Sequence, residues 1–350
     1  MKTVTIKPGT PWEPTAKERG QKTLNLLIAV AISFVLLYST GLNGKLGWVA
    51  AFFFSYVSVS FIAEYRRAGK PAAQDSLLTS ISRFAIFLAI IPIASILATV
   101  ISKGWRGLHW GLFTQDMSEA TVNSPIQEGG MLAAIVGTLI MVGLALIFTL
   151  PIAILTALYL TEIKGKFARP IRFLVQAMSG VPSIVAGLFI LSSIVYPVTG
   201  ERSGLMGALA LSILMIPTVA RTSEEVLKLI PSDLREAGLA LGATQWRTVA
   251  MVVIPAARSG LITAVILGIA RVVGETAPLL LTIGGADAIN LNPTQGNMSA
   301  FPYYVWKNLL IGSENAISRA WQGVFVLMVI VFIFFALARY FGAAKGSRRK

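Results

Sequence analysis

Long apolar runs separated by short polar segments dominate the chain from residue 24 onward. The runs that carry almost no charged side chain lie at about 24–44, 46–63, 84–102, 130–160, 173–196, 204–220, 259–283 and 320–338. Each run is close to or above the roughly 20 residues that an α-helix needs to cross about 30 Å of hydrocarbon. The pattern therefore predicts an all-α polytopic membrane protein with eight spans.

The first two runs differ from the other six in how they are connected. A tight turn around Gly44 joins them, whereas the later runs are separated by loops that contain glycine, proline and charged residues. We predict a six-span core preceded by an extra two-helix hairpin. The predicted segments are a polar cytoplasmic arm at 1–23, a transmembrane hairpin at 24–63, a cytoplasmic linker at 64–83, a core at 84–342 and a basic cytoplasmic tail at 343–350.

Composition and charge support a membrane protein and suggest its orientation. Mean hydropathy is +0.72 and only 13% of residues are charged, which is too apolar for an ordinary soluble domain. With the N-terminus inside, 23 of the 30 lysine and arginine residues lie in cytoplasmic segments. This distribution follows the positive-inside rule and places both termini in the cytoplasm. It also explains the net charge of +14 through anionic membrane lipid, without nucleic acid.

The residue inventory argues against catalysis by this chain. It has no cysteine and a single histidine, His109, so thiolate chemistry and sites with two histidines are excluded. Neither a HExxH sequence nor a nucleotide-binding P-loop occurs. We therefore expect no cofactor and no metal, and any ATP hydrolysis must come from a partner subunit.

The polar stretch between the sixth and seventh runs predicts a short helical hairpin on the cytoplasmic side. Ser232 or Asp233 supplies an N-cap oxygen, and Glu236 follows in the first turn. Gly242 takes the left-handed position that ends this helix. Thr244 then caps a second helix, which Pro255 ends. The core domain therefore includes a cytoplasmic loop at 221–258.

Arg271 and Glu275 are the only ionisable residues inside a predicted span. A helix that starts near Ser259 places Arg271 roughly 18 Å along its axis, near the middle of the bilayer. A charge there is costly and is expected to face the helix bundle or a cavity. One interpretation is a structural ion pair between the two residues. The other is a translocation pathway, in which the guanidinium contacts an anion and Glu275 competes for it.

The cytoplasmic loop resembles the EAA motif of permease subunits in binding-protein-dependent ABC importers. That motif reads EAA, three residues, G, nine residues and I-x-L-P, and the chain has Glu236-Ala237-Gly238, then Gly242, then VVIP at 252–255. Gly238 replaces the second alanine of the motif. In the final string Val252 replaces isoleucine and Ile254 replaces leucine. In that family the loop is a coupling helix that docks into the ATPase subunit.

Further strings are similar to the PstA-type phosphate permeases within this family. They are RVVGETAPLL at 271–280, VPSIVAGLF at 181–189, and GGM at 129–131 followed by GTL at 137–139. The similarity runs from about residue 84 to 340 and leaves the first two runs without a counterpart. A permease for another oxyanion or for a phosphonate is the alternative within the same class.

The resemblance implies the fold, the partners and the roles of particular residues. The fold would be the transmembrane domain of a type I ABC importer. The partners would be a PstC-type permease forming a heterodimer, two PstB-type ATPases in the cytoplasm and a PstS-type phosphate-binding protein outside. The residues implied in ATPase coupling are Leu234, Glu236, Ala237, Gly238, Leu241, Gly242 and Pro255, and those in the substrate pathway are Arg271 and Glu275.

Overall fold

The computed structural model describes residues 16–41, 44–121 and 124–342. Residues 1–15 of the arm predicted at 1–23, and the predicted tail at 343–350, lie outside them, whereas residues 16–23 form the start of the first helix. The described chain is helical, with no strand beyond one isolated bridge between Gly284 and Met298. Six of its helices are long and apolar enough to cross a membrane, or seven if one bent pair counts as a span. The all-α membrane fold is thus confirmed. The chain forms two compact units, Met1–Leu97 and Ala98–Lys350.

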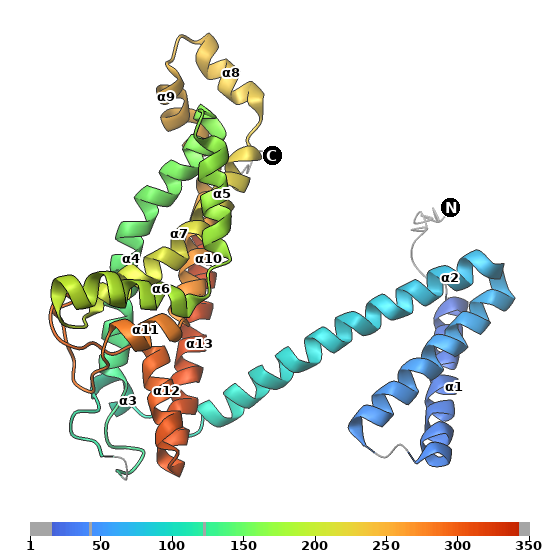
Figure 1. Cartoon of the computed structure of the whole chain (residues 1–350). Coiled ribbons are helices and arrows are strands. Elements are labelled where there is room, and N and C mark those ends of the chain that lie inside the picture. The colour runs from blue at the N-terminus through green and yellow to red at the C-terminus, as the bar shows by residue number, and fades with distance from the viewer. Residues whose placement is uncertain (1–15, 42–43, 122–123, 343–350) are drawn as a thin grey trace, which may run out of the picture. The chain divides into compact units, whose positions relative to one another are not determined.

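The N-terminal unit contains α1, Ala16–Thr40, and most of α2, Lys45–Gly104. Inside this unit the rings of Phe34 and Trp48 meet edge to face at 4.4 Å, so α1 packs against the start of α2 (Figure 1). Gly69 interrupts α2 with a φ of 79° and a ψ of −171°, values that glycine adopts at little steric cost. The predicted linker at 64–83 is therefore helical on both sides of Gly69, and α2 carries two of the apolar runs.

Four long helices form the centre of the second unit. They are α4, Leu132–Leu158, which a π-helical turn η1 extends over Tyr159–Ile163; α7, Gly204–Lys228; α10, Ile254–Val273; and α13, Glu314–Gly342. Helix α7 packs against α4 and α10. Ala145 and Ala208 are fully buried between α4 and α7. Small side chains at such contacts let helix backbones approach closely, which is how helices associate in membranes.

The predicted span at 173–196 is not one straight helix. Helix α5, Ala168–Ser179, is followed by α6, Ser183–Ile190, and by the π-helical η2, Leu191–Thr199, and the two parts meet at an angle of 102°. Pro182 lies at the break with a ψ of 138°. Proline lacks an N–H and disfavours helical geometry in the residue before it, so the chain changes direction here.

The predicted span at 259–283 also differs from the structure. Helix α10 ends at Val273, and the short α11, Ala277–Thr282, follows after a break. A proline ring clashes with the carbonyl four residues earlier, and for Pro278 that residue is Gly274. The broken segment carries Glu275, which is therefore not one helical turn beyond Arg271 on a common helix.

Short helices mark the two ends of the second unit. Helices α8, Ser232–Ala240, and α9, Gln245–Thr248, lie at one end, whereas α3, Gly111–Thr114, and α12, Phe301–Ile311, lie at the other (Figure 1). The long helices run between these ends. The hairpin that resembles the EAA motif is thus separated by the length of the bundle from the loops at 103–129 and 284–319.

Candidate functional site: coupling hairpin and charged helix end

The hairpin formed by α8 and α9 begins one residue earlier than the predicted cap. Pro231 is the N-cap residue, with a φ of −57° and a ψ of 143°, so Ser232 and Asp233 lie in the first turn. The predicted side-chain cap is therefore wrong, because the restricted φ of proline already sets the helix boundary. Glu236 lies beyond the first turn.

The turn between α8 and α9 has the predicted chemistry. Gly242 has a φ of 81°, and its N–H donates to the Leu239 carbonyl at 2.9 Å, which confirms the left-handed helix end. The hydroxyl of Thr244 accepts a hydrogen bond from the Arg247 N–H at 3.4 Å and caps α9, as predicted. These two residues reverse the chain at the tip of the hairpin.

Pro255 does not end the second helix of the hairpin, contrary to the prediction. Helix α9, the π-helical η3, Val249–Val253, and α10 form one continuous segment from Gln245 to Val273. The N–H of Ile254 bonds to the Val249 carbonyl, five residues back. This wider π turn directly precedes Pro255 and changes the hydrogen-bond pattern there, so the continuous segment accommodates the proline.

Arg235 anchors α8 to the end of α4 through Glu162. Its Nε and Nη2 donate to the Glu162 carboxylate at 2.9 and 2.8 Å, while Nη1 and Nη2 donate to the carbonyls of Ile230 and Leu227. The Gln245 side chain donates to the Glu162 carbonyl at 2.8 Å. The hydrogen bonds to Glu162 raise the pKa of Arg235, which is charged in any case. No local sequence pattern indicates this pair, because 73 residues separate its members.

Gly238 allows the two helices of the hairpin to approach closely. A Cβ atom at this position would lie 2.6 Å from Cγ2 of Thr248, well inside van der Waals contact. The departure from the EAA pattern at Gly238 therefore has a packing reason in this chain.

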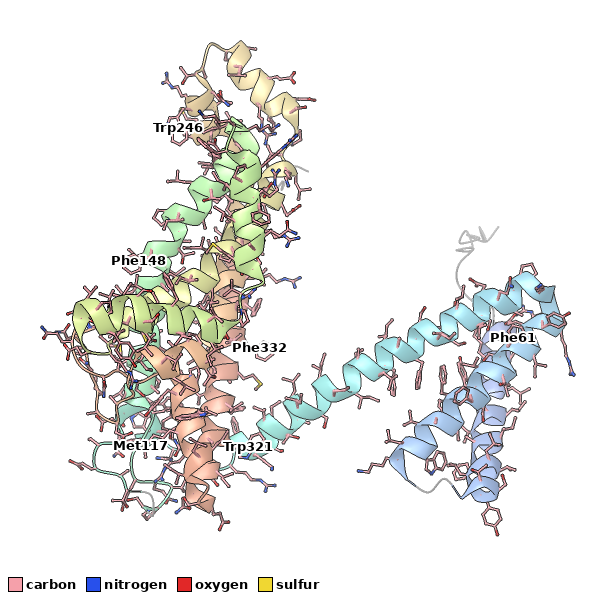
Figure 2. The ribbon with its side chains drawn as sticks, in the orientation of Figure 1. Phe61, Met117, Phe148, Trp246, Trp321 and Phe332 are labelled. Carbon is pink, nitrogen blue, oxygen red and sulfur yellow. The ribbon has the colours of Figure 1, made fainter. Side chains whose placement is uncertain are left out.

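The outer face of the hairpin is apolar and exposed. Leu234 is 42% exposed, Leu241 is 89% exposed, and Trp246 on α9 is 61% exposed. Figure 2 shows Trp246 at the hairpin end of the unit. Glu236 and Ala237 are also exposed, whereas Pro255 lies away from the tip at the start of α10. Large apolar side chains that stay exposed on a segment outside the apolar spans are typical of a protein-binding surface.

Arg271 and Glu275 lie at the end of α10 and in the break that follows it. Arg271 is exposed and Glu275 is half-buried. Within the described residues, neither side chain forms an ion pair or a hydrogen bond, with the other or with any third group. The interpretation as a structural ion pair therefore has no support in this arrangement.

Two of the strings that resemble PstA-type permeases lie against each other, and the third lies against the segment at 298–301. Gly187 of α6 faces Pro278 of α11, and a Cβ atom on Gly187 would lie 2.6 Å from the Pro278 Cα. Gly137 of α4 lies against the Ser299 backbone, and the adjacent Thr138 hydroxyl accepts a hydrogen bond from the Phe301 N–H at 2.9 Å. The bent span and the broken helix thus pack together through α6 and α11.

This close contact predicts different outcomes for two glycine substitutions. Gly187→Ala pushes α6 and α11 apart and is expected to destabilise the protein by roughly 1–3 kcal/mol, the usual cost of overpacking. Gly143→Ala is the matched control, since its Cβ would meet nothing within 4 Å and alanine favours a helix. Thermal unfolding of the purified protein measures both. Equal melting temperatures for the two variants would contradict the observed contact.

Broken apolar helices are typical of membrane transport proteins, and an exposed helical hairpin between two spans agrees with a permease. In solved structures, the MetNI methionine ABC transporter shares this fold, with a TM-score of 0.50 and 20% identity, over 61% of this chain and 94% of that chain. The model of the family described as "Binding-protein-dependent transport system inner membrane component" matches residues 149–345. The chain belongs to this family, as the sequence indicated, and is a multi-pass membrane protein.

Several curated relatives are similar over most of their length. The phosphate transport system permease protein PstA 1 of Mycobacterium tuberculosis is 36% identical over 261 residues, 74% of this chain and 85% of the relative. PstA of Haemophilus influenzae is 34% identical over 278 residues, which cover 76% and 93% of the two chains. The probable PstA of Methanocaldococcus jannaschii is 32% identical, with the same coverage. The predicted resemblance to PstA-type permeases is confirmed.

Proposed function

We propose that this chain is the transmembrane permease subunit of an ATP-driven importer of inorganic phosphate. The observation that carries the proposal is its identity of 32–36% to PstA proteins over about three quarters of the chain. The contact between Gly187 and Pro278 adds support, since it joins two of the strings on which the resemblance rests. The chain forms the pathway, and a separate ATPase subunit hydrolyses ATP.

The hairpin is the docking element for that ATPase. The distribution of basic residues along the sequence supports a cytoplasmic position for the hairpin and for both termini. Leu234 and Leu241 pack into a groove of the ATPase, and Glu236 meets a basic side chain there. The loops at the other end of the unit face the phosphate-binding protein, and a second permease of the PstC type completes the pathway. Two PstB-type ATPases, one for each permease, drive the complex.

Motion of the hairpin reaches the pathway through one helix. Because α9, η3 and α10 are continuous from Gln245 to Val273, a displacement of the tip moves Arg271 as well. Arg271 offers a guanidinium fork that matches two oxygens of a phosphate shedding its water. Glu275 lies four residues later in the chain. Its carboxylate competes with the phosphate for Arg271 and so shortens the time for which the phosphate stays bound. The pathway alternates between access from outside and access from the cytoplasm.

Docking of the ATPase is expected to fail when Gly242 is replaced by valine. A β-branched residue at a φ of 81° is strained by roughly 1–2 kcal/mol, enough to displace the tip and lower the yield of co-purified ATPase about tenfold. Gly200→Val is the matched control, because Gly200 also has a positive φ and open space around it. Insertion of both variants into the membrane is expected to be normal. Undiminished ATPase recovery with Gly242→Val would refute the docking role.

The proposed substrate is tested on the complete complex. The chain is co-purified with its partners and reconstituted with the binding protein, and ATP hydrolysis is measured with and without inorganic phosphate. Stimulation by phosphate, with weaker stimulation by sulfate and phosphonates, is the expected result. Stimulation by a phosphonate or another oxyanion in place of phosphate would instead assign the importer to that substrate.

A further inference from the structure

A large basic cleft lies beside the coupling hairpin. It has a volume of about 1000 Å³ and is bounded by the end of α4 with η1, the start of α5 and the inner side of the hairpin. One carboxylate, that of Glu162, lines it. The basic side chains that line it are Lys164, Lys166, Arg169, Arg172, Lys228 and Arg235.

Three of these basic side chains are already paired. Arg235 binds Glu162, and both Arg172 and Lys228 bind Glu224, at 2.8 and 2.9 Å. The Glu224 side chain is only 5% exposed and lies behind the wall of the cleft. These ion pairs fix the side chains that form the wall of the cleft. They do not neutralise the other basic side chains that line it.

The other three, Lys164, Lys166 and Arg169, are exposed and have no carboxylate partner among the described residues. Lys164 is held in place by its backbone, since it has a φ of 51°, and its N–H donates to the Tyr159 carbonyl at 3.0 Å. It is the one non-glycine residue with a positive φ in the described part of the chain. This tight turn after η1 brings three positive charges into the cleft within six residues.

We propose that the basic cleft binds a phosphate group on the side of the membrane where the ATPase docks, either as inorganic phosphate or as the phosphate of an anionic lipid headgroup. A cleft lined by one sign of charge concentrates the opposite ion. Arg169 offers a planar fork to two phosphate oxygens, and the two lysines add point charges. The inference rests on the proposed function for its cytoplasmic orientation.

Occupancy of the cleft bears directly on the coupling hairpin. Arg235 lines the cleft and holds α8 through Glu162, so a bound phosphate competes with Glu162 for the same guanidinium. When Arg235 leaves Glu162, α8 loses its contact with the end of α4 or moves relative to it. Phosphate that accumulates in the cytoplasm, or the lipid composition of that leaflet, thereby adjusts how well the ATPase is coupled.

The test uses the complex of permeases and ATPases without the binding protein, in nanodiscs that are open to both sides. All variants carry Arg271→Gln, which removes the proposed pathway contact. The cleft variant is Lys166→Gln with Arg169→Gln. The control is Arg221→Gln with Arg258→Gln, which removes the same charge from exposed positions that do not line the cleft.

Two arms identify the source of the phosphate group. In zwitterionic nanodiscs, equilibrium binding of radiolabelled inorganic phosphate is measured. In the other arm, phosphatidylglycerol retained by the complex is counted by mass spectrometry without added phosphate. At least one arm is expected to show saturable binding that weakens about tenfold or more in the cleft variant, and with added salt, but not in the control.

Two results would overturn the inference. One is the absence of saturable binding in both arms, and the other is equal binding by the cleft variant and the control. If either result is found while the complex without substitutions shows phosphate-stimulated ATP hydrolysis with its binding protein, only the proposed phosphate site in the cleft is refuted. If the complex without substitutions shows no stimulation of ATP hydrolysis by phosphate in the presence of the binding protein, the proposed function is refuted instead.

Discussion

Replacing Arg235 by methionine is expected to reduce phosphate-stimulated ATP hydrolysis by about a hundredfold or more in the assembled complex. The substitution leaves the Glu162 carboxylate, 7% exposed, without its partner. Breaking a buried pair on one side costs about 3–5 kcal/mol, and the lower end applies here because the Arg235 side chain is 25% exposed. A cost of about 3 kcal/mol is still enough to detach α8 from the end of α4 in most molecules. The measurement compares ATP hydrolysis by reconstituted wild type and variant at equal content of every subunit.

A double variant separates the anchoring role from a general loss of charge. Glu162→Gln with Arg235→Met removes both ions, so no buried charge stays unpaired, and part of the lost activity is expected to return. Arg247→Met, an exposed arginine of the same hairpin, is the charge-matched single control. An Arg235→Met complex as active as this control would show that the pair does not position the hairpin.

Replacing Arg271 by glutamine is expected to lower phosphate uptake by about ten- to a hundredfold. Hydrogen bonds to a charged group contribute roughly 1.5–3 kcal/mol, and the glutamine amide keeps neither the charge nor the two-pronged geometry of the guanidinium. Uptake of radiolabelled phosphate into proteoliposomes is measured for complexes whose assembly is verified by co-purification.

Two further substitutions, Arg271→Lys and Glu275→Gln, test the guanidinium geometry and the competing carboxylate separately. Lysine keeps the charge but not the fork, so uptake is expected to fall between that of wild type and Arg271→Gln. Glu275→Gln removes the competitor and is expected to tighten phosphate binding while slowing turnover. Normal uptake by the Arg271→Gln complex would remove Arg271 from the pathway.

The sequence predicted the helical content well, because a chain in lipid must satisfy its backbone hydrogen bonds within each segment. Most residues of every apolar run are helical, but the runs at 173–196 and 259–283 are each interrupted by a break between two helices. A hydropathy pattern does not show where a helix changes direction, however, so the breaks in the spans at 173–196 and 259–283 were not predicted. Pro92 and Pro151 lie inside continuous helices, whereas Pro182 and Pro278 begin new ones, and only the surrounding packing separates the two cases.

The site was predictable where its chemistry is local. Gly242 and Thr244 act through their own turn, and both were placed correctly. The anchor between Glu162 and Arg235 depends on chain segments 73 residues apart, and each residue alone is typical of a charged cytoplasmic loop. Pro255 was misjudged for a related reason, since the adjacent π turn leaves no mark in the sequence pattern.

That π turn gives the segment from the hairpin to Arg271 a mechanical property. A π turn holds one residue more than an α turn, and it can migrate along a helix by exchanging hydrogen-bond partners one residue at a time. Each residue that it passes rotates by about 100° and advances by about 1.5 Å relative to the helix beyond. A shift of the π turn from Val249–Val253 into α10 would therefore rotate the first residues of α10, next to the docking hairpin, relative to the part of α10 that carries Arg271.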